Sequence, residues 1–218
     1  LGSRNDDQKT LTYHWQSDNG FDTTFTNSVR FNYLHNLYAG RYTLDYIDES
    51  NGCSGSEVID LDQPDPVRIN RATVSTYPGG YNVTCYGSED GSIQLNSISG
   101  GHENTYEYLW KTLSGTEIID PLSKNQENLS AGIYEITVAD TFACAVTDTF
   151  ELIQPSEISI NAEVSLSNNG EYNINCNGES TGYIKLQVSG GGSGVYNYQW
   201  EQKPEASSEI NNLPAGDY

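Results

Sequence analysis

Two stretches of the chain place an apolar residue at every second position. These residues are Tyr42, Leu44 and Tyr46 in the first stretch and Tyr134, Ile136 and Val138 in the second. Residues i, i+2 and i+4 of an extended chain lie on one face of a sheet. The alternation therefore predicts a β-strand in each stretch, with one face buried and the other in water.

Both predicted strands begin in the motif Leu-x-Ala-Gly-x-Tyr, and a third copy of this motif closes the sequence. The three copies end at Tyr42, Tyr134 and Tyr218. The glycine suits a tight corner, because it adopts backbone conformations that other residues avoid. A tyrosine at this place resembles the tyrosine corner of immunoglobulin-like sandwiches, where the hydroxyl bonds back to the backbone. We expect all three tyrosines to belong to structural cores.

Other landmarks recur with a period of about ninety residues, which indicates an internal repeat. Pairs 91 residues apart are Pro64 and Pro155, Cys53 and Cys144, and Cys85 and Cys176. The period predicts the C-terminal part of a first repeat (1–64), one complete repeat (65–155) and the N-terminal part of a third (156–218). The complete repeat contains about seven candidate strands separated by turn residues. We therefore predict an all-β chain of tandem immunoglobulin-like, Greek-key β-sandwiches.

Each repeat also carries an aromatic stripe at strand spacing. The stripes are Tyr13 and Trp15, then Tyr106, Tyr108 and Trp110, then Tyr196, Tyr198 and Trp200. Exposed stripes of this kind stack on sugars, but tryptophan on a central strand more often packs inside a sandwich. We expect Trp15, Trp110 and Trp200 to be core residues.

One segment of the complete repeat resembles the SprB repeat. It runs from Val83-Thr-Cys85 through Gly91-Ser-Ile-Gln-Leu95 and Gly100-Gly101 to Tyr106-x-Tyr108-x-Trp110, and a second match begins at Asn175-Cys176. The family takes its name from a giant cell-surface adhesin of gliding Bacteroidetes that is exported by type IX secretion. The resemblance implies an extracellular protein at the outer cell surface, with a part in surface attachment and gliding motility.

The charge of the chain restricts the classes of molecule that we expect it to bind. Thirty acidic residues against ten basic ones give a net charge of −20. Phosphate backbones are bound by clustered lysine and arginine, so nucleic acid is not an expected partner. No apolar run approaches the length of a membrane span. We expect contacts with neighbouring repeats, with polysaccharide or abiotic surfaces, and with cell-surface motility or secretion proteins.

Four cysteines in an exported chain suggest disulfides. The favoured pairing joins Cys85 to Cys144 within the complete repeat, and the alternative joins Cys53 to Cys85 and Cys144 to Cys176. A third possibility is that the thiols are reduced and packed as small apolar groups. No histidine lies near a cysteine at the spacing of a zinc motif, so structural zinc is not expected.

Carboxylates at predicted strand ends are candidate calcium ligands. Asp48 and Asp140 lie where the corner strands end, and Asp90 lies in an acidic loop. Calcium would need six to eight oxygen atoms in one place. The competing interpretation is that these aspartates stabilise turns through their own hydrogen bonds, and it is the stronger one because no EF-hand loop is present.

No catalytic motif is recognisable, so we do not expect an enzyme. Asn82-Val-Thr84 and Asn128-Leu-Ser130 match the acceptor pattern for N-glycosylation. The sequence favours a structural or adhesive segment of a very large surface adhesin. The alternative is a carbohydrate-binding accessory module of a secreted multidomain enzyme.

Overall fold

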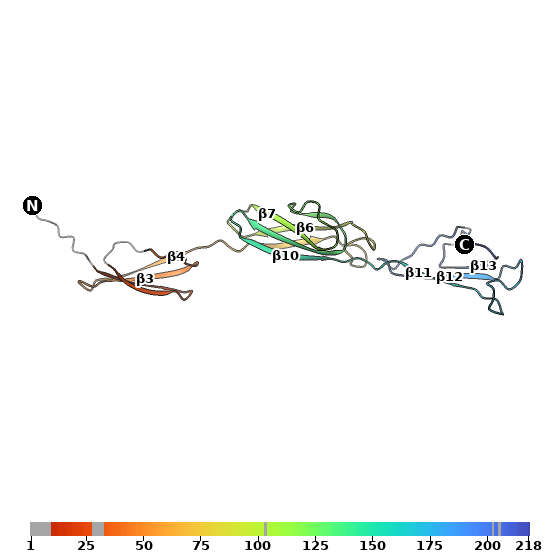
Figure 1. The fold of residues 1–218 in the computed structure, drawn as a ribbon, viewed down its shortest axis with the longest axis horizontal. Helices are drawn as coiled ribbons and strands as arrows, with labels where there is room; N and C mark the ends of the chain where they lie inside the picture. Colours follow the sequence, from red (N-terminus) through yellow and green to blue (C-terminus); the bar gives the residue numbers. More distant parts are fainter. Residues whose placement is uncertain (1–9, 28–32, 103, 202, 205) are drawn as a thin grey trace, which may run out of the picture. The chain divides into compact units, whose positions relative to one another are not determined.

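The computed structural model describes residues 10–27, 33–102, 104–201, 203–204 and 206–218. The described residues form strands and no helix, which confirms the all-β prediction. The strands build four antiparallel sheets (Figure 1). The chain divides into two compact units, Leu1–Asp65 and Pro66–Tyr218. No helix in the described ranges is long and apolar enough to cross a membrane.

The first unit contains a four-stranded sheet in the order β2-β1-β3-β4. Its strands are β1 (Leu11–Ser17), β2 (Asp22–Asn27), β3 (Gly40–Asp48) and β4 (Ser54–Leu61). The strand predicted after the first corner is β3, which pairs with β1 on one side and β4 on the other. β2 lies in a segment of mostly polar residues and pairs with β1.

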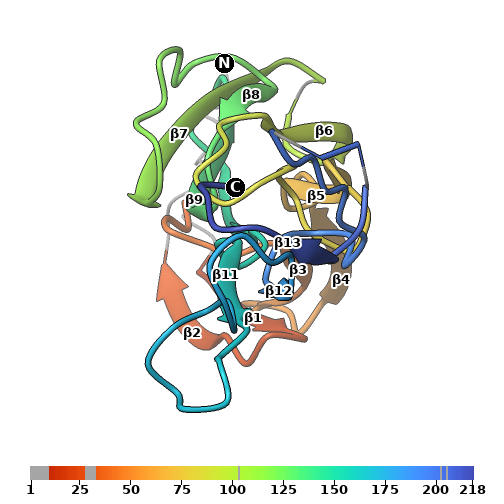
Figure 2. The same cartoon turned by 90° about the vertical axis from the view of Figure 1, so that its right-hand side faces the viewer.

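Residues 66–155 of the second unit form a β-sandwich, called here the central sandwich. Its strands are β5 (Arg68–Val74), β6 (Gly91–Ser99), β7 (Tyr106–Ser114), β8 (Gln126–Leu129), β9 (Gly132–Asp140) and β10 (Ala145–Leu152). They form two sheets, β5-β6-β8 and β10-β9-β7. Figure 2 shows β7 and β9 on one side and β5 and β6 on the other.

One apolar core fills the space between these two sheets. Its buried residues come from both of them and are Val67, Ile93, Leu95, Trp110, Leu129, Tyr134, Ile136, Val138 and Leu152. The alternation predicted for the second corner strand is visible in β9, where Tyr134, Ile136 and Val138 have no exposed surface. Burying a large apolar side chain contributes about 1.5–3 kcal/mol, so this face of β9 contributes substantially to the stability of the sandwich.

The central sandwich has two ends that carry different residues. The end at which the chain enters the sandwich is called the entry end. Here β5 begins at Arg68 opposite Ser99, and Tyr106 lies opposite Asp140. The opposite end, at which the chain leaves the sandwich, is called the exit end. Here β10 ends at Leu152 opposite Gly132. The terminal strands β5 and β10 therefore run in the same direction, from the entry end to the exit end.

The second unit also contains a three-stranded sheet in the order β11-β12-β13. Its strands are β11 (Ser159–Val164), β12 (Gly182–Ser189) and β13 (Glu209–Leu213). The register of β11 on β12 is continuous, whereas β12 and β13 shift register at Gly182.

Two segments lie outside the sheets. Residues 82–85 form bends, and the backbone amide of Asn82 donates to the carbonyl of Ile153 at the exit end. Residues 196–200 carry the third aromatic stripe but enter no sheet among the described residues.

Candidate functional site

The exit end of the central sandwich is closed by the side chain of Asn82, which is 8 % exposed. Its Nδ2 donates to the carbonyl of Ser75 at 2.8 Å, and its Oδ1 accepts the amide of Ile153 at 2.8 Å. The backbone amide of Asn82 also donates to the carbonyl of Ile153. Ser75 directly follows β5 and Ile153 directly follows β10, so one buried amide ties the two terminal strands together.

The same serine–asparagine pair recurs beside the β11-β12-β13 sheet. Asn173 Nδ2 donates to the carbonyl of Ser165 at 2.8 Å, as Asn82 does to Ser75. In both pairs the serine hydroxyl donates to the asparagine carbonyl, at 2.6 Å in the first and 2.8 Å in the second. Because the same hydrogen bonds occur in both places, they are a feature of the repeat.

The predicted core aromatics occupy different environments. Tyr42, Trp110 and Tyr134 are buried, whereas Trp15, Trp200 and Tyr218 are half-buried. Each corner hydroxyl donates to the carbonyl four residues earlier, at distances of 2.8 Å for Tyr42, 3.0 Å for Tyr134 and 2.9 Å for Tyr218. The bond fixes the corner that precedes each strand.

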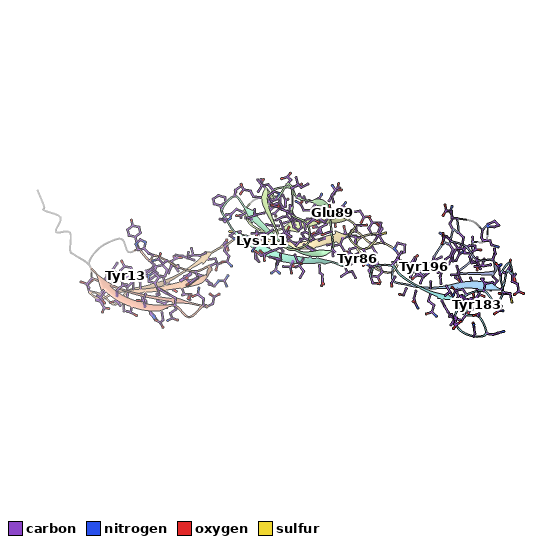
Figure 3. The ribbon with its side chains drawn as sticks, turned by 45° about the vertical axis from the view of Figure 1, so that its right-hand side comes forward. Tyr13, Tyr86, Glu89, Lys111, Tyr183 and Tyr196 are labelled. Atoms are coloured by element: carbon purple, nitrogen blue, oxygen red, sulfur yellow. The ribbon has the colours of Figure 1, made fainter. Side chains whose placement is uncertain are left out.

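The aromatic stripe of β7 is part of the core and forms no exposed sugar platform. Trp110 is 3 % exposed, and Tyr106 and Tyr108 pack against the core cluster. Tyr106 donates to the carbonyl of Gly100 at 2.8 Å, and Tyr196 makes the matching bond to Gly190. The exposed tyrosine of this region is Tyr86, in the loop at the exit end that Figure 3 marks with Tyr86 and Glu89.

The entry end is organised around Asp140, the last residue of β9. Its side chain has no exposed surface. Oδ1 accepts the backbone amides of Phe142 and Cys144, both at 2.9 Å, and Oδ2 accepts the amide of His102 at 2.9 Å. The His102 amide, together with the other donors, holds the pKa of Asp140 well below its usual range despite burial. Asp140 is therefore a fixed carboxylate.

Two further side chains complete this cluster. The Nδ1 atom of His102 lies 3.2 Å from Asp140 Oδ2 and 3.8 Å from the Sγ atom of Cys144. The imidazole stacks on Phe142 with 4.3 Å between ring centroids. Burial, together with the neighbouring Asp140 charge, raises the pKa of the Cys144 thiol. A nitrogen, an oxygen and a sulfur atom thus face one another at the entry end.

The other candidate calcium ligands act in turns. Asp48 accepts the amide of Ser50 at 3.0 Å and the side-chain amide of Asn51 at 3.1 Å. Asp90 accepts the amide of Thr84 at 3.0 Å and its hydroxyl at 2.6 Å. Asp90 lies at the exit end and Asp140 at the entry end, so the structure does not bring these two carboxylates together.

The favoured disulfide is corrected by the structure, in which all four cysteines are free thiols. Cys85 lies at the exit end, where the nearby Gly87 amide donates to the side chain of Gln154. Cys144 lies at the entry end, directly before β10. The eight residues of β10 separate the two by roughly 26 Å, whereas a disulfide requires Cα atoms within about 7 Å.

Two functional residues escaped the sequence analysis. Asn82 was considered as a glycosylation acceptor, but its amide is buried and bonded on both sides, which leaves no room for a glycan. His102 was set aside because no cysteine lies near it in sequence, yet Cys144 reaches it from 42 positions away. The recurrence of Ser75 and Asn82 as Ser165 and Asn173 was a signal for the first; nothing local could have revealed the second.

Fold and geometry together define an all-β protein with a recurring serine–asparagine pair, which in the central sandwich joins the ends of the terminal strands. The family model of the SprB repeat matches residues 81–115 and 172–203. Two segments of the chain are therefore similar to the SprB repeat, a family associated with cell-surface proteins. The matched segments contain Asn82, Asn173 and His102, while Asp140 and Cys144 lie outside them. No curated protein matches the chain.

Proposed function

We propose that this chain is a structural segment of a very large bacterial adhesin that functions in surface attachment and gliding motility. The parent protein is exported by type IX secretion and acts at the outer surface of a Bacteroidetes cell. In this proposal the segment transmits tension between its neighbours and performs no catalysis. Adhesion to polysaccharide or abiotic surfaces then draws on many repeats, whose weak contacts add through avidity.

The observation that carries this proposal is the tie between the terminal strands of the central sandwich. Tension on a repeat enters through β5 and leaves through β10, which run in the same direction between opposite ends. Asn82 joins the residue after β5 to the residue after β10 at the exit end. Tension therefore loads the bonds between strands along the strand axis, and several bonds must break together before the sandwich opens.

A stiff, soluble surface suits such a segment. The net charge of −20 keeps neighbouring copies of the chain apart, since like charges repel. The three corner hydrogen bonds and the buried core of β9 stabilise the sheets from within. Neighbouring repeats and the motility or secretion proteins of the cell surface are the partners that the proposal implies.

Pulling the whole chain by its two ends tests this role. Asn82→Ala removes two buried hydrogen bonds, which costs about 1–3 kcal/mol, and we expect a clearly lower unfolding force for the central sandwich. The control is Ile136→Val, a core change of about 1 kcal/mol on β9 that leaves the Asn82 tie intact. Single-molecule force spectroscopy compares the two variants.

The proposal requires the unfolding force to fall more in Asn82→Ala than in Ile136→Val for the same loss of equilibrium stability, measured by chemical denaturation. Equal forces in Asn82→Ala and the wild-type chain would refute a mechanical role for the tie. Asn96→Ala, at an exposed position of β6, checks that removing an asparagine side chain has no effect by itself.

A further inference from the structure

We propose that His102, Asp140 and Cys144 form a binding site for a divalent transition-metal ion of the zinc class at the entry end of the central sandwich. The three residues offer one ligand atom each, and these atoms lie within 4.8 Å of one another. No other such group occurs among the residues that the structure describes. The site is independent of the mechanical role proposed above, because it lies at the opposite end of the sandwich from Asn82.

The spacing of the ligand atoms is close to that of a tetrahedral metal site. Bonds of about 2.0–2.3 Å to nitrogen, oxygen and sulfur place neighbouring ligand atoms roughly 3.3–3.7 Å apart. The His102 nitrogen lies 3.2 Å from the Asp140 oxygen and 3.8 Å from the Cys144 sulfur. The Asp140 oxygen and the Cys144 sulfur lie within 4.8 Å of each other, and the His102 side chain is 40 % exposed, so solvent can supply a fourth ligand.

The carboxylate of this site is already in place. Backbone amides hold both oxygens of Asp140 and keep the group ionised. Oδ2 accepts the His102 amide and also faces His102 Nδ1 at 3.2 Å, so a cation bound between these two atoms would replace their direct contact. Little conformational freedom remains to be lost when an ion binds, which favours affinity.

The ligand set selects the class of ion. Imidazole and thiolate suit zinc and its neighbours in the transition series, whereas calcium needs six to eight oxygen atoms. The site therefore favours an ion that accepts nitrogen and sulfur over calcium, for which Asp140 was a candidate ligand. An acidic chain with a net charge of −20 further concentrates cations around the site.

Binding displaces protons from the ligands. The Cys144 thiol loses its proton to solvent, and a neutral His102 binds through Nδ1 while its proton sits on Nε2. A cation at this position favours the deprotonated thiolate, because thiolate is the form of cysteine that ligates metal ions. The affinity must therefore rise with pH.

The first unit supplies a natural comparison. Its β3–β4 turn contains an aspartate and a cysteine, Asp48 and Cys53, in corresponding places. There Asn51 donates to the carboxylate in place of a histidine. We therefore expect the chain to bind one ion and not two.

Titration of the full chain with Zn²⁺ under reducing conditions tests the site. The background carries Cys53→Ser, Cys85→Ser and Cys176→Ser, which removes the exposed thiols and leaves Cys144. Isothermal titration calorimetry should give one ion per chain and tighter binding at pH 8 than at pH 6. Co²⁺ in place of zinc should show a sulfur-to-cobalt charge-transfer band.

Variants of the ligand residues distinguish binding at this site from non-specific attraction of cations to the acidic chain. Cys144→Ala should abolish the cobalt–sulfur band, and His102→Gln should weaken Zn²⁺ binding by about 100-fold or more, since even outer-shell changes cost 10–100-fold. His14→Gln, at the histidine that pairs with Asp22, is the matched control and should change nothing. Circular dichroism verifies that each variant is folded.

The proposal is overturned if the background chain binds no Zn²⁺. It is equally overturned if folded His102→Gln binds as tightly as its parent, or if His14→Gln weakens binding as much. Hydrogen exchange provides a second readout: zinc should slow exchange in the β9–β10 turn of the parent chain and leave the β3–β4 turn unaffected.

Discussion

The β9–β10 turn of the central sandwich and the β3–β4 turn of the first unit are built on the same plan. Each follows an aspartate at the last position of a strand, and each aspartate amide donates to a cysteine carbonyl, at 2.9 Å for Asp140 and 2.8 Å for Asp48. Each carboxylate also accepts the amide two residues later. The difference lies in the second carboxylate oxygen, which meets His102 in one turn and Asn51 in the other.

This difference determines which parts of the structure each aspartate connects. Asn51 belongs to the same turn as Asp48, so that bond stabilises the turn alone. His102 follows β6, a strand of the opposite sheet, and thus Asp140 joins the two sheets of the sandwich at the entry end. A turn-capping carboxylate becomes a tie between sheets when a neighbouring connection supplies its donors.

Replacing each aspartate by asparagine should give the largest contrast between the two turns. In Asp140→Asn an amide group must face one of the backbone donors that now bond to the carboxylate, so we expect the central sandwich to melt about 5 °C lower or more. In Asp48→Asn the affected donors Ser50 and Asn51 belong to the same turn as residue 48 and join no second sheet, so the loss should be smaller. Differential scanning calorimetry measures both changes.

Hydrogen exchange assigns each loss to its own unit. Faster exchange should be confined to β9 and the 99–106 connection in Asp140→Asn, and to the β3–β4 turn in Asp48→Asn. Equal destabilisation by the two substitutions would show that the tie to His102 adds nothing to the common turn.

The strand pattern could be predicted from the sequence because it is local. The alternation at Tyr134, Ile136 and Val138 reports directly which face of β9 is buried. The ends of the sandwich could not be predicted in the same way, since their contacts join residues far apart. Cys85 and Cys144 suited a disulfide by composition, but only the topology shows that β10 separates them.

The capping residues illustrate the same limit. Asp140 and Asp48 were recognised as turn formers from their positions at strand ends, and that interpretation agrees with their hydrogen bonds. Their different partners depend on where the β6–β7 connection passes, which no periodicity reports. Asn82 was hidden for a similar reason, because its partner Ile153 lies 71 positions away.

Acid should weaken the inter-sheet tie in a predictable direction. The pKa of Asp140 is lowered in the folded chain, so its contribution to stability is complete above the ordinary carboxyl pKa of about 4 and is lost as the pH falls below it. The titratable groups that face Asp140 are His102 and Cys144. We expect the stability of the central sandwich to fall between pH 5 and 3 more steeply in the wild-type chain than in Asp140→Asn.

Urea denaturation measures this dependence at each pH, followed by tryptophan fluorescence in chains that carry Trp15→Phe and Trp200→Phe, so that Trp110 alone reports. Asp90→Asn serves as a control, because the Thr84 hydroxyl and amide also lower the pKa of Asp90 at the exit end. That substitution should remove a separate part of the acid sensitivity. Identical pH profiles for Asp140→Asn and the wild-type chain would contradict the role assigned to the Asp140 carboxylate.

The smallest effect should come from the residue before each cysteine. Ala143 has a φ of 64° and Gly52 a φ of 74°, both in the left-handed region. Alanine is strained there and glycine is not, so Gly52→Ala should cost about 1 kcal/mol, all of it conformational since its Cβ would meet no atom within 4 Å. Ala143→Gly relieves the backbone strain but raises the conformational entropy of the unfolded chain. The net gain in the free energy of unfolding should therefore stay below about 1 kcal/mol. If Ala143→Gly instead destabilises the β9–β10 turn in urea denaturation, the alanine methyl group contributes packing that offsets its strain, and the two turns differ in more than the partner of their aspartates.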